Sequence, residues 1–345
     1  MHSTIRLPVA TSRVLISILN WNASAETIAC VESVRAAACE SGASPHAILV
    51  IDNASRPDEW EALAPLTAAD DTTVWRSASN LGFAAGHNLA IRAAQAAGHE
   101  FVWLLNNDAR VAPNACDSLL ALLDGDPRCG AASPLIVSRD DVGRYDFCGA
   151  THDWRRLETP RPTTPAAARA LEAADPFCMW LAGTAVMLRL RALTQVGLLD
   201  DTLFAYFEDD DLGVRLSRAG WTSRLAFDTL AVHAGGRDQF VMRPPYYFYL
   251  MTRNGLRFWL AHTPAPYRLL IRYRLAARAF ILADRLTRAG HADKATAVLL
   301  GVQDGLLRRA GAPDLARRPS WSVRCGAKFF SYRLYSFVNE WLAAW

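Results

Sequence analysis

Short apolar runs alternate with helical patterns between residue 14 and about residue 125, and this alternation narrows the folds that the chain can adopt. An apolar run of this kind, bounded by polar turn residues, is typical of a buried strand. Strands joined by short connections through helices form a parallel sheet covered on both faces. The expected strands are Val14–Leu19, Ala47–Ile51, Thr73–Arg76 and Phe101–Leu105. The first helix is expected over residues 25–40, with Ser24 as its N-cap, and the second begins at Pro57. A third helix follows the loop Asn80–Asn88 and ends at about Ala97, and a fourth begins at Pro113. The sequence therefore predicts an α/β fold.

The pattern is less regular after residue 125, where proline and alanine are frequent. In chain order we expect a strand over Pro134–Val137, a variable surface loop through Pro160, Pro162, Pro165 and the alanine-rich stretch that follows, a buried strand over Trp180–Leu188, a helix that stops near Gly197, a helix from the acidic run 208–211 to Gly220, and a strand over Ser223–Phe227.

The cysteines and the apolar segments indicate where the protein resides. The seven cysteines form no close pair and no metal-finger spacing, which is typical of reduced thiols in the cytoplasm. The N-terminus has no signal-peptide pattern. The longest uncharged apolar stretch, Phe177–Leu188, has 12 residues and is too short to span a bilayer. We expect a cytoplasmic protein that either stays free or rests on the inner face of the cell membrane.

Charge divides the chain into two parts. Residues 241–345 hold 17 Lys and Arg against 5 Asp and Glu, a net charge of +12. Residues 1–240 hold 20 basic and 29 acidic residues, a net charge of −9. Such a split indicates a domain boundary near residue 240 and different partners for the two parts.

The strand at Phe101 stops abruptly on Asn106, Asn107 and Asp108. In an open α/β sheet, ligands bind outside the carboxyl ends of the strands. A carboxylate at that position is well placed to hold a hard cation through oxygen. The simpler interpretation is a turn, since Asn and Asp suit tight turns. On this motif alone the two interpretations are about equally probable.

Four acidic residues in succession, Glu208 to Asp211, form a second candidate site. One or two carboxylates would be stabilised by the dipole of the helix that begins there. Four repel one another, so a functional site is the better interpretation. The run lacks the alternating ligand spacing of a calcium loop. We also expect the neighbouring charges to raise the pKa of a base within it.

His233 follows an apolar run and precedes Ala234, Gly235 and Gly236, so it is either an ordinary histidine or a ligand of a metal or phosphate. Several alternative classes lack their motif. No Gly-x-Gly-x-x-Gly follows the first strand, no Gly-Lys-Ser/Thr phosphate loop occurs, and no Gly-x-Ser-x-Gly elbow is present. The dehydrogenase, phosphate-loop and hydrolase classes are therefore disfavoured.

Several motifs in order along residues 13–236 resemble glycosyltransferase family 2, and within it the bacterial rhamnosyltransferase-like branch. The motifs are Asn20-Trp21-Asn22, Ile51-Asp52-Asn53-Ala54-Ser55, the segment Asn80 to Asn88, Leu105-Asn106-Asn107-Asp108, Gly183-Thr184-Ala185, Phe207-Glu208-Asp209-Asp210-Asp211-Leu212 and His233. The resemblance implies a GT-A fold, a mixed and mainly parallel sheet flanked by helices. It also implies a nucleotide-sugar donor, a divalent cation (Mg²⁺ or Mn²⁺) and inversion at the anomeric carbon.

The resemblance also implies a role for individual residues. Asp108 matches the last position of the family's Asp-x-Asp element, whose first position is Asn106 here, and His233 matches a metal-contacting histidine. Asp209 matches the general base. The nucleotide-sugar site would comprise Asn20, Asn22, Asp52, Asn80, Gly82, Asn107 and Asp108, the metal ligands would be Asp108 and His233, and the acceptor site would comprise Glu208, Asp211 and Trp180.

This assignment agrees with the chemistry of the reaction. Displacing a nucleoside diphosphate needs a cation to neutralise the leaving phosphates, and the attacking hydroxyl needs a base on the opposite side. We expect residues 1–240 to form the catalytic domain of an enzyme that transfers a sugar onto a saccharide or lipid-linked acceptor of a bacterial envelope polysaccharide. The first candidate for the sugar is L-rhamnose, carried by a deoxythymidine-diphosphate donor. The alternatives are a galactose or N-acetylglucosamine transferase with a uridine-diphosphate donor, and a non-catalytic nucleotide-sugar-binding scaffold.

Residues 241–345 resemble the family only loosely and read as a basic helical region. Arginines in this region are interleaved with aromatic and aliphatic residues, and six of them are Arg253, Arg257, Arg268, Arg272, Arg274 and Arg278. The region is expected either to pack on the catalytic domain or to rest on an anionic membrane. No recognised nucleic-acid motif accompanies the charge, so nucleic acid is not expected as a partner.

Overall fold

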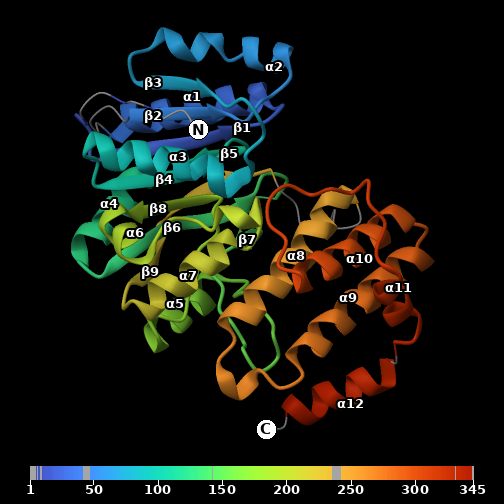
Figure 1. Ribbon diagram of the computed structural model, residues 1–345. Helices are drawn as coiled ribbons and strands as arrows, with labels where there is room; N and C mark the ends of the chain where they lie inside the picture. Colours follow the sequence, from blue (N-terminus) through green and yellow to red (C-terminus); the bar gives the residue numbers. More distant parts are fainter. Residues whose placement is uncertain are drawn as a thin grey trace. The chain divides into compact units, whose positions relative to one another are not determined.

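The computed structural model describes residues 5, 7, 10–41, 47–141, 143–234, 242–330 and 332–343 (Figure 1). The chain divides into two compact units. Unit 1 comprises Met1–Thr151, Arg161–Asp201 and Glu208–Arg237, and unit 2 comprises His152–Pro160, Thr202–Phe207 and Asp238–Trp345. The boundary expected near residue 240, like Gly235 and Gly236, lies outside the described residues.

Unit 1 is built on one mixed sheet. Its described strands are β1 (Val14–Asn20), β2 (Ala47–Asp52), β3 (Thr72–Arg76), β4 (Phe101–Asn106), β5 (Ala109–Val111), β6 (Cys129–Ser138), β7 (Tyr145–Phe147), β8 (Ala185–Arg189) and β9 (Thr222–His233). Their order is β3-β2-β1-β4-β8-β6-β9-β5, with β7 paired to β6. Strands β3, β2, β1 and β4 are parallel neighbours and follow one another in Figure 1. The fold is the α/β architecture that the sequence predicts.

Strand β8 runs antiparallel between β4 and β6. This reversal brings the start of β8 beside the end of β4, and the amide of Asn106 donates to the carbonyl of Thr184 over 2.8 Å. Strand β9 pairs in parallel with β6, and its last residue, His233, lies opposite Ala109 of β5. The segments after β4, before β8 and at the end of β9 therefore meet at one edge of the sheet.

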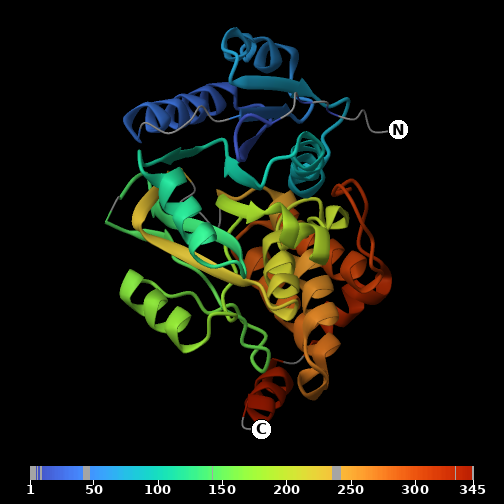
Figure 2. The same cartoon turned by 90° about the vertical axis from the view of Figure 1, so that its left-hand side faces the viewer.

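Helices cover both faces of this sheet. The described helices of unit 1 are α1 (Ser24–Ser41), α2 (Pro57–Glu61), η1 (Ala64–Ala68), α3 (Gly82–Ala97), α4 (Ala115–Gly125), α5 (Pro165–Ala174), α6 (Leu190–Val196) and α7 (Glu208–Arg218). Side chains alternate along the buried strands, so that Ile16 and Trp103 face α1 and α4 while Leu15 and Leu104 face α3 and α7. Figure 2 shows α1 and α4 on one side of the sheet and α3 on the other.

Two expectations about unit 1 are wrong, and a third is wrong in detail. The alanine-rich stretch after Pro165 is a helix, α5, because Pro165 takes the first helical position and the Thr164 hydroxyl accepts from the amide of Ala167. The strand expected from Trp180 begins only at Ala185, and Trp180 forms an isolated bridge with Ala150. The Ser24 hydroxyl donates to Glu59 over 2.6 Å instead of capping α1.

Unit 2 is helical, as expected for the C-terminal region. Its described helices are α8 (Pro245–His262), η4 (Ala265–Tyr267), α9 (Ile271–Arg288), α10 (Ala292–Leu306), α11 (Trp321–Lys328) and α12 (Tyr332–Ala343), and the short helix η2 (Asp201–Leu203) begins in unit 1 and ends in unit 2. Helices α8 and α10 touch at Gly301, where a Cβ would lie 2.7 Å from the carbonyl oxygen of Tyr249. Among the described residues, no helix has both the length and the apolar character that crossing a bilayer requires.

Two of the six arginines noted in the sequence are buried and bind within unit 2. Arg253 and Arg274 are 0% and 2% exposed. Arg274 donates to the carbonyl of Arg155, and Arg253 donates to the carbonyls of Leu203 and Gly311. These two cations are thus part of the packing of unit 2, and any membrane-facing surface has to use other side chains.

Candidate active site

The residues expected to bind the nucleotide follow neighbouring strands of the sheet. Asn20 ends β1 and lies opposite Asp52, the last residue of β2. Asn106 ends β4 on the other side of β1, opposite Leu19. Because these strands are parallel, their carboxyl ends share one edge, which is where open α/β sheets bind ligands. The structure thus brings Asn20, Asp52 and the Asn106–Asp108 turn together.

Asp52 is fully buried and is bound by protein groups through both oxygens. Its Oδ1 accepts from Asn20 Nδ2 over 2.8 Å, and its Oδ2 accepts from the amide of Ser55 over 3.1 Å. Arg76 Nε lies 3.3 Å from the same Oδ2. The carboxylate therefore organises the turn after β2, in addition to any contact with a base.

The remaining residues expected at the nucleotide site stabilise the same loops. Asn20 Oδ1 accepts from the Thr27 hydroxyl, which in turn accepts from Asn107 Nδ2 over 3.0 Å. Asn22 Oδ1 accepts from the amide of Arg56. Asn80 Oδ1 accepts from the amide of Gly82 over 2.8 Å, and Gly82 has a φ of 81°, which favours glycine at the start of α3.

Asp108 and His233 lie side by side although 125 positions separate them in the chain. His233 Nε2 is 3.3 Å from Asp108 Oδ1. Burial raises the pKa of the Asp108 carboxyl, but the hydrogen bond and charge of His233 outweigh it and leave the pKa below its ordinary value. An ionised carboxylate next to an imidazole is a donor set that Mg²⁺ or Mn²⁺ accepts. Among the described residues no group of three or more potential metal ligands is present.

Two arginines next to Asp108 were not predicted from the sequence. Arg139 donates to the backbone carbonyl of Asp108 over 2.9 Å and to Glu26, and Arg110 also donates to Glu26. The hydrogen bond from Arg139, against some desolvation, lowers the pKa of Glu26 to about 2. Nothing in the local sequence marks these residues, because Glu26 lies in α1 and Arg139 follows β6. Both cations therefore lie beside the turn that follows β4.

Asp209 is the second residue of α7 and reaches the same edge through a chain of backbone contacts. Its Oδ2 accepts from the amide of Gly183 over 3.0 Å, and its Oδ1 accepts from the amide of Asp210. Gly183 precedes Thr184, whose carbonyl accepts from the amide of Asn106. The segment Gly183–Thr184 is therefore hydrogen-bonded both to Asp209 and to Asn106, the first residue of the Asn106–Asp108 turn.

Burial dominates the electrostatics of the acidic run. It raises the pKa of Asp209, with the amides of Gly183 and Asp210 opposing it. It also raises the pKa of Glu208 and Asp210 well above the ordinary value, and the charge of Asp209 adds to both shifts. The pKa of Asp209 is raised as expected, but the largest cause is desolvation and not repulsion by its neighbours. Asp211 differs, since it forms an ion pair with Arg215 over 2.7 Å.

Trp180, expected to bind the acceptor, is buried beside α7. A Cβ on Gly213 would lie 2.3 Å from Trp180 Cβ, so the close approach requires glycine at this position of α7. The Trp180 ring contacts Phe147, with centroids 5.2 Å apart. The exposed guanidinium of Arg161 lies 5.6 Å from the Trp180 ring and also lowers the pKa of Asp209. Arg161 is a third cation near the site, after Arg110 and Arg139, that its local sequence does not reveal.

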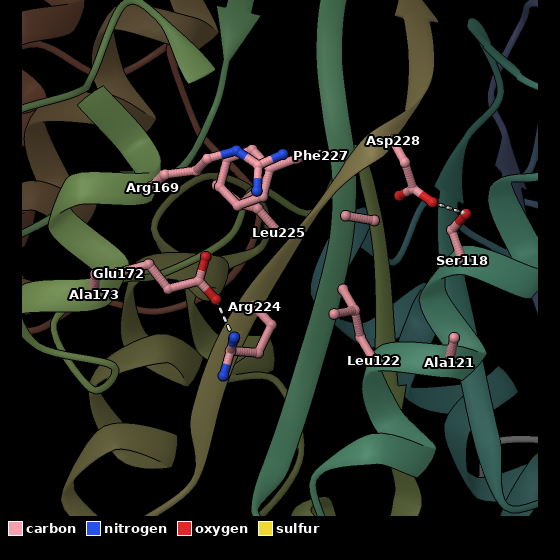
Figure 3. A pocket seen from close by; sticks show the side chains of 11 residues that line it. Ser118, Ala121, Leu122, Arg169, Glu172, Ala173, Arg224, Leu225, Phe227 and Asp228 are labelled. Atoms are coloured by element: carbon pink, nitrogen blue, oxygen red, sulfur yellow. Dashed lines mark hydrogen bonds and ion pairs between the residues drawn. The ribbon is translucent and has the colours of Figure 1, made fainter. Parts of the chain in front are cut away.

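Two cavities in the described part of unit 1 have different linings, and only one of them borders the acidic run. A small cavity of about 20 Å³ is bounded by Gly183, Glu208 and Asp209. A larger one, of about 590 Å³, is lined by α4, α5 and Arg224–Asp228 of β9 (Figure 3). Within the lining Arg224 forms an ion pair with Glu172, Asp228 accepts from the Ser118 hydroxyl, and Arg169 lies over the Phe227 ring. At about 3.3 Å per residue this lining lies at least ~15 Å back along β9 from His233, so we do not assign it to the same site.

Solved structures with the same fold identify the architecture. The mannosyltransferase of Pyrobaculum calidifontis in complex with GDP-mannose and Mn²⁺ matches with a TM-score of 0.53 at 15% identity, over 99% of this chain and 87% of that chain. GalNAc-T7 with UDP, GalNAc and Mn²⁺ matches with a TM-score of 0.52 at 16% identity, over 78% of this chain and 51% of that chain. The fold is therefore that of the GT-A glycosyltransferases.

Two family models also match the sequence. The glycosyl transferase family 2 model covers residues 15–180, and the glycosyl transferase family group 2 model covers residues 101–279. The chain belongs to glycosyltransferase family 2 and is a glycosyltransferase, as its motifs predict.

Two curated relatives are similar over much of the chain. An N-acetylglucosaminyl-diphospho-decaprenol L-rhamnosyltransferase of Mycobacterium tuberculosis (strain H37Rv) is 29% identical over 265 residues, 69% of this chain and 83% of that protein. The galactofuranosyltransferase GlfT1 of Mycolicibacterium smegmatis is 26% identical over 197 residues, 57% of this chain and 64% of that protein.

Proposed function

We propose that this protein transfers L-rhamnose, with inversion, from a deoxythymidine-diphosphate donor to an N-acetylglucosaminyl-diphosphate-polyprenol acceptor in the synthesis of a bacterial envelope polysaccharide. The observation that carries the proposal is the meeting of Asp108, His233 and Asp209 at one edge of the sheet. The similarity to the mycobacterial rhamnosyltransferase supports the choice of sugar and acceptor.

The site residues account for the reaction as follows. Asp209 accepts the proton of the attacking acceptor hydroxyl, whose oxygen forms the new bond to the anomeric carbon. The bond to the nucleoside diphosphate breaks on the opposite side, which inverts the anomeric configuration. Asp108 and His233 would hold the divalent cation, which neutralises charge on the leaving diphosphate. Arg139, next to Asp108, adds a fixed positive charge on that side.

A donor panel tests this proposal. With Mg²⁺ or Mn²⁺ present, we expect slow hydrolysis of dTDP-L-rhamnose, and faster transfer when an N-acetylglucosaminyl-diphosphate-lipid is added. Release of dTDP and mass spectrometry of the lipid product are the measurements. Preference for a uridine-diphosphate sugar, including UDP-galactofuranose as the similarity to GlfT1 would suggest, would replace the donor but keep the class. Binding of nucleotide sugars with no turnover of any donor would instead favour a non-catalytic scaffold.

We further propose that the protein rests on the inner face of the cell membrane through α12, where a lipid-linked acceptor is found. Leu334, Phe337 and Trp341 follow at helical spacing on one side of α12, and all three are exposed. Trp321, at the start of α11, and Phe329, just after its end, are further exposed apolar side chains of unit 2. The net charge of +12 in residues 241–345 is complementary to an anionic lipid surface.

Phe337→Glu is expected to release the protein from vesicles of anionic phosphatidylglycerol. The substitution removes an apolar side chain that is 66% exposed, the largest value among the described apolar side chains of α12, and adds a negative charge. Flotation of protein with vesicles is the measurement, and Leu306→Glu, an exposed leucine at the end of α10, is the matched control. Equal flotation of wild type and Phe337→Glu, or no flotation of the wild type, would contradict the membrane proposal.

A further inference from the structure

The segment that precedes the acidic helix has an unusual backbone. Within residues 202–207, Phe204, Tyr206 and Phe207 have φ values of 68°, 70° and 72°. Left-handed backbone is disfavoured for residues with a Cβ and is genuinely rare for bulky ones. Such conformations persist only when the surroundings impose them, and they gather at functional sites. Two residues after Phe207 the chain reaches Asp209.

A single buried amide of unit 2 holds this segment. Asn254, in α8, is fully buried, and its Nδ2 lies 2.7–2.9 Å from the carbonyl oxygens of Leu203, Ala205 and Tyr206. One nitrogen with two hydrogens therefore serves three carbonyls of one tight turn. In the observed backbone conformation these carbonyls converge on one nitrogen, so the amide stabilises that conformation.

Neighbouring residues of α8 complete the anchor. Arg253, also fully buried, donates to the carbonyl of Leu203 over 2.7 Å and to Asn254 Oδ1 over 2.9 Å, which orients the amide. Arg257 donates to the carbonyl and the hydroxyl of Thr202. A Cβ on Gly255 would lie 3.2 Å from the Phe207 ring, so glycine lets that ring lie against α8.

We infer that Asn254, oriented by Arg253, is a positioning residue that fixes the left-handed backbone of Phe204 and Tyr206 and so sets how the chain begins α7 and presents Asp209. The inference rests on the proposed role of Asp209 as the base. It concerns a group that touches neither donor nor acceptor, and it acts through the covalent continuity of Phe207 with Glu208.

The test introduces glycine or alanine at position 206 of the Asn254→Ala variant, in which the hydrogen bonds from the Asn254 amide are lost. Asn254→Ala is expected to lower kcat at least 10-fold while donor affinity, measured by calorimetry, changes less than twofold. Adding Tyr206→Gly is expected to restore kcat to within about threefold of the wild type, because glycine adopts positive φ freely. Adding Tyr206→Ala removes the same ring but keeps the backbone penalty, so it should restore nothing.

Val298→Ala is the control for lost stability. Val298, in α10, is buried and is not one of the residues that hold the segment 202–207. We expect it to lower Tm as much as Asn254→Ala does while leaving kcat unchanged. Should Asn254→Ala fail to fold, the same two substitutions at position 206 are made in Arg257→Gln, whose half-buried side chain holds only the start of the segment.

The outcomes separate this inference from the proposed function. A wild type that turns over no donor would refute the proposed function. Amide hydrogen exchange of residues 202–210 would still show whether Asn254 stabilises the backbone of this segment. Faster exchange in Asn254→Ala that Tyr206→Gly alone reverses supports the inference. An active wild type whose kcat survives Asn254→Ala, or rescue by alanine and glycine alike, would overturn it.

Discussion

Replacing Asp209 by asparagine is expected to lower kcat by about 10²–10⁴-fold, the range that a positioned general base contributes. An amide of nearly the same shape keeps a carbonyl oxygen for the amide of Gly183 but cannot take up a proton at neutral pH. Donor binding should change little, because the nucleotide-side residues follow other strands. The measurements are kcat from transfer assays and the donor Kd from calorimetry. Loss of donor binding with unchanged kcat at saturation would assign Asp209 to the donor instead.

The pH profile of the wild type gives a second readout of the same base. Burial raises the pKa of Asp209 above the ordinary 3.8 of an aspartate, and the base works only when ionised. Activity should therefore fall as the pH drops through this raised pKa, and the acid limb should lie at a higher pH than an exposed aspartate would give. Residual activity of Asp209→Asn should lack this limb.

Asp210→Asn is the matched control for this substitution. Burial, together with the charge of Asp209, holds the pKa of Asp210 well above its ordinary value and so favours the neutral acid. An amide should replace a neutral carboxyl at modest cost to kcat. If Asp210→Asn and Asp209→Asn lose activity equally, the base is a property of the acidic run as a whole and not of Asp209.

Replacing Asp108 by alanine is expected to abolish the effect of Mn²⁺ on nucleotide affinity and to reduce transfer about 10³-fold or more, since a metal ion supplies several kcal/mol of charge stabilisation in such reactions. His233→Ala should weaken the dependence on Mn²⁺ but not remove it, because Asp108 keeps the carboxylate. Chelation by EDTA should bring the wild type to the level of Asp108→Ala. Calorimetry of nucleotide binding with and without Mn²⁺ measures the effect independently of turnover.

Asp117→Asn, an exposed carboxylate at the start of α4, is the control for a general loss of negative charge. It should leave both the Mn²⁺ effect and kcat unchanged. Full activity of Asp108→Ala, or of the wild type in EDTA, would show that Asp108 and His233 form an ion pair of structural importance alone.

The sequence is sufficient to predict the architecture because local and tertiary signals agree there. The apolar runs of β1, β2 and β4 end on Asn20, Asp52 and Asn106, and a parallel sheet must bring such ends together. The ion pair of Asp211 with Arg215 could also be predicted from the sequence, because the two residues are four positions apart on a helix. The expected strand at Trp180 was wrong because an apolar run alone does not show whether a neighbouring strand pairs with it.

Other features depend on partners that no local pattern indicates. Arg139 reaches Asp108 from the end of β6, and Asn254 binds a turn about fifty residues earlier in the chain. The left-handed backbone of Phe204, Tyr206 and Phe207 is opposite to the preference of aromatic residues, so their sequence argues against it. Such positions are determined by tertiary contacts. The segment that we propose to position Asp209 is one of them.

Unit 2 is assembled from three separate stretches of polypeptide, two of which are excursions from within unit 1. A chimera joined at residue 240 would exchange the helices but leave residues 152–160 and 202–207 of the original parent behind. Grafting between homologues therefore calls for three matched segments transplanted together, and divergence in α8 should be accompanied by compensating change in those two short excursions.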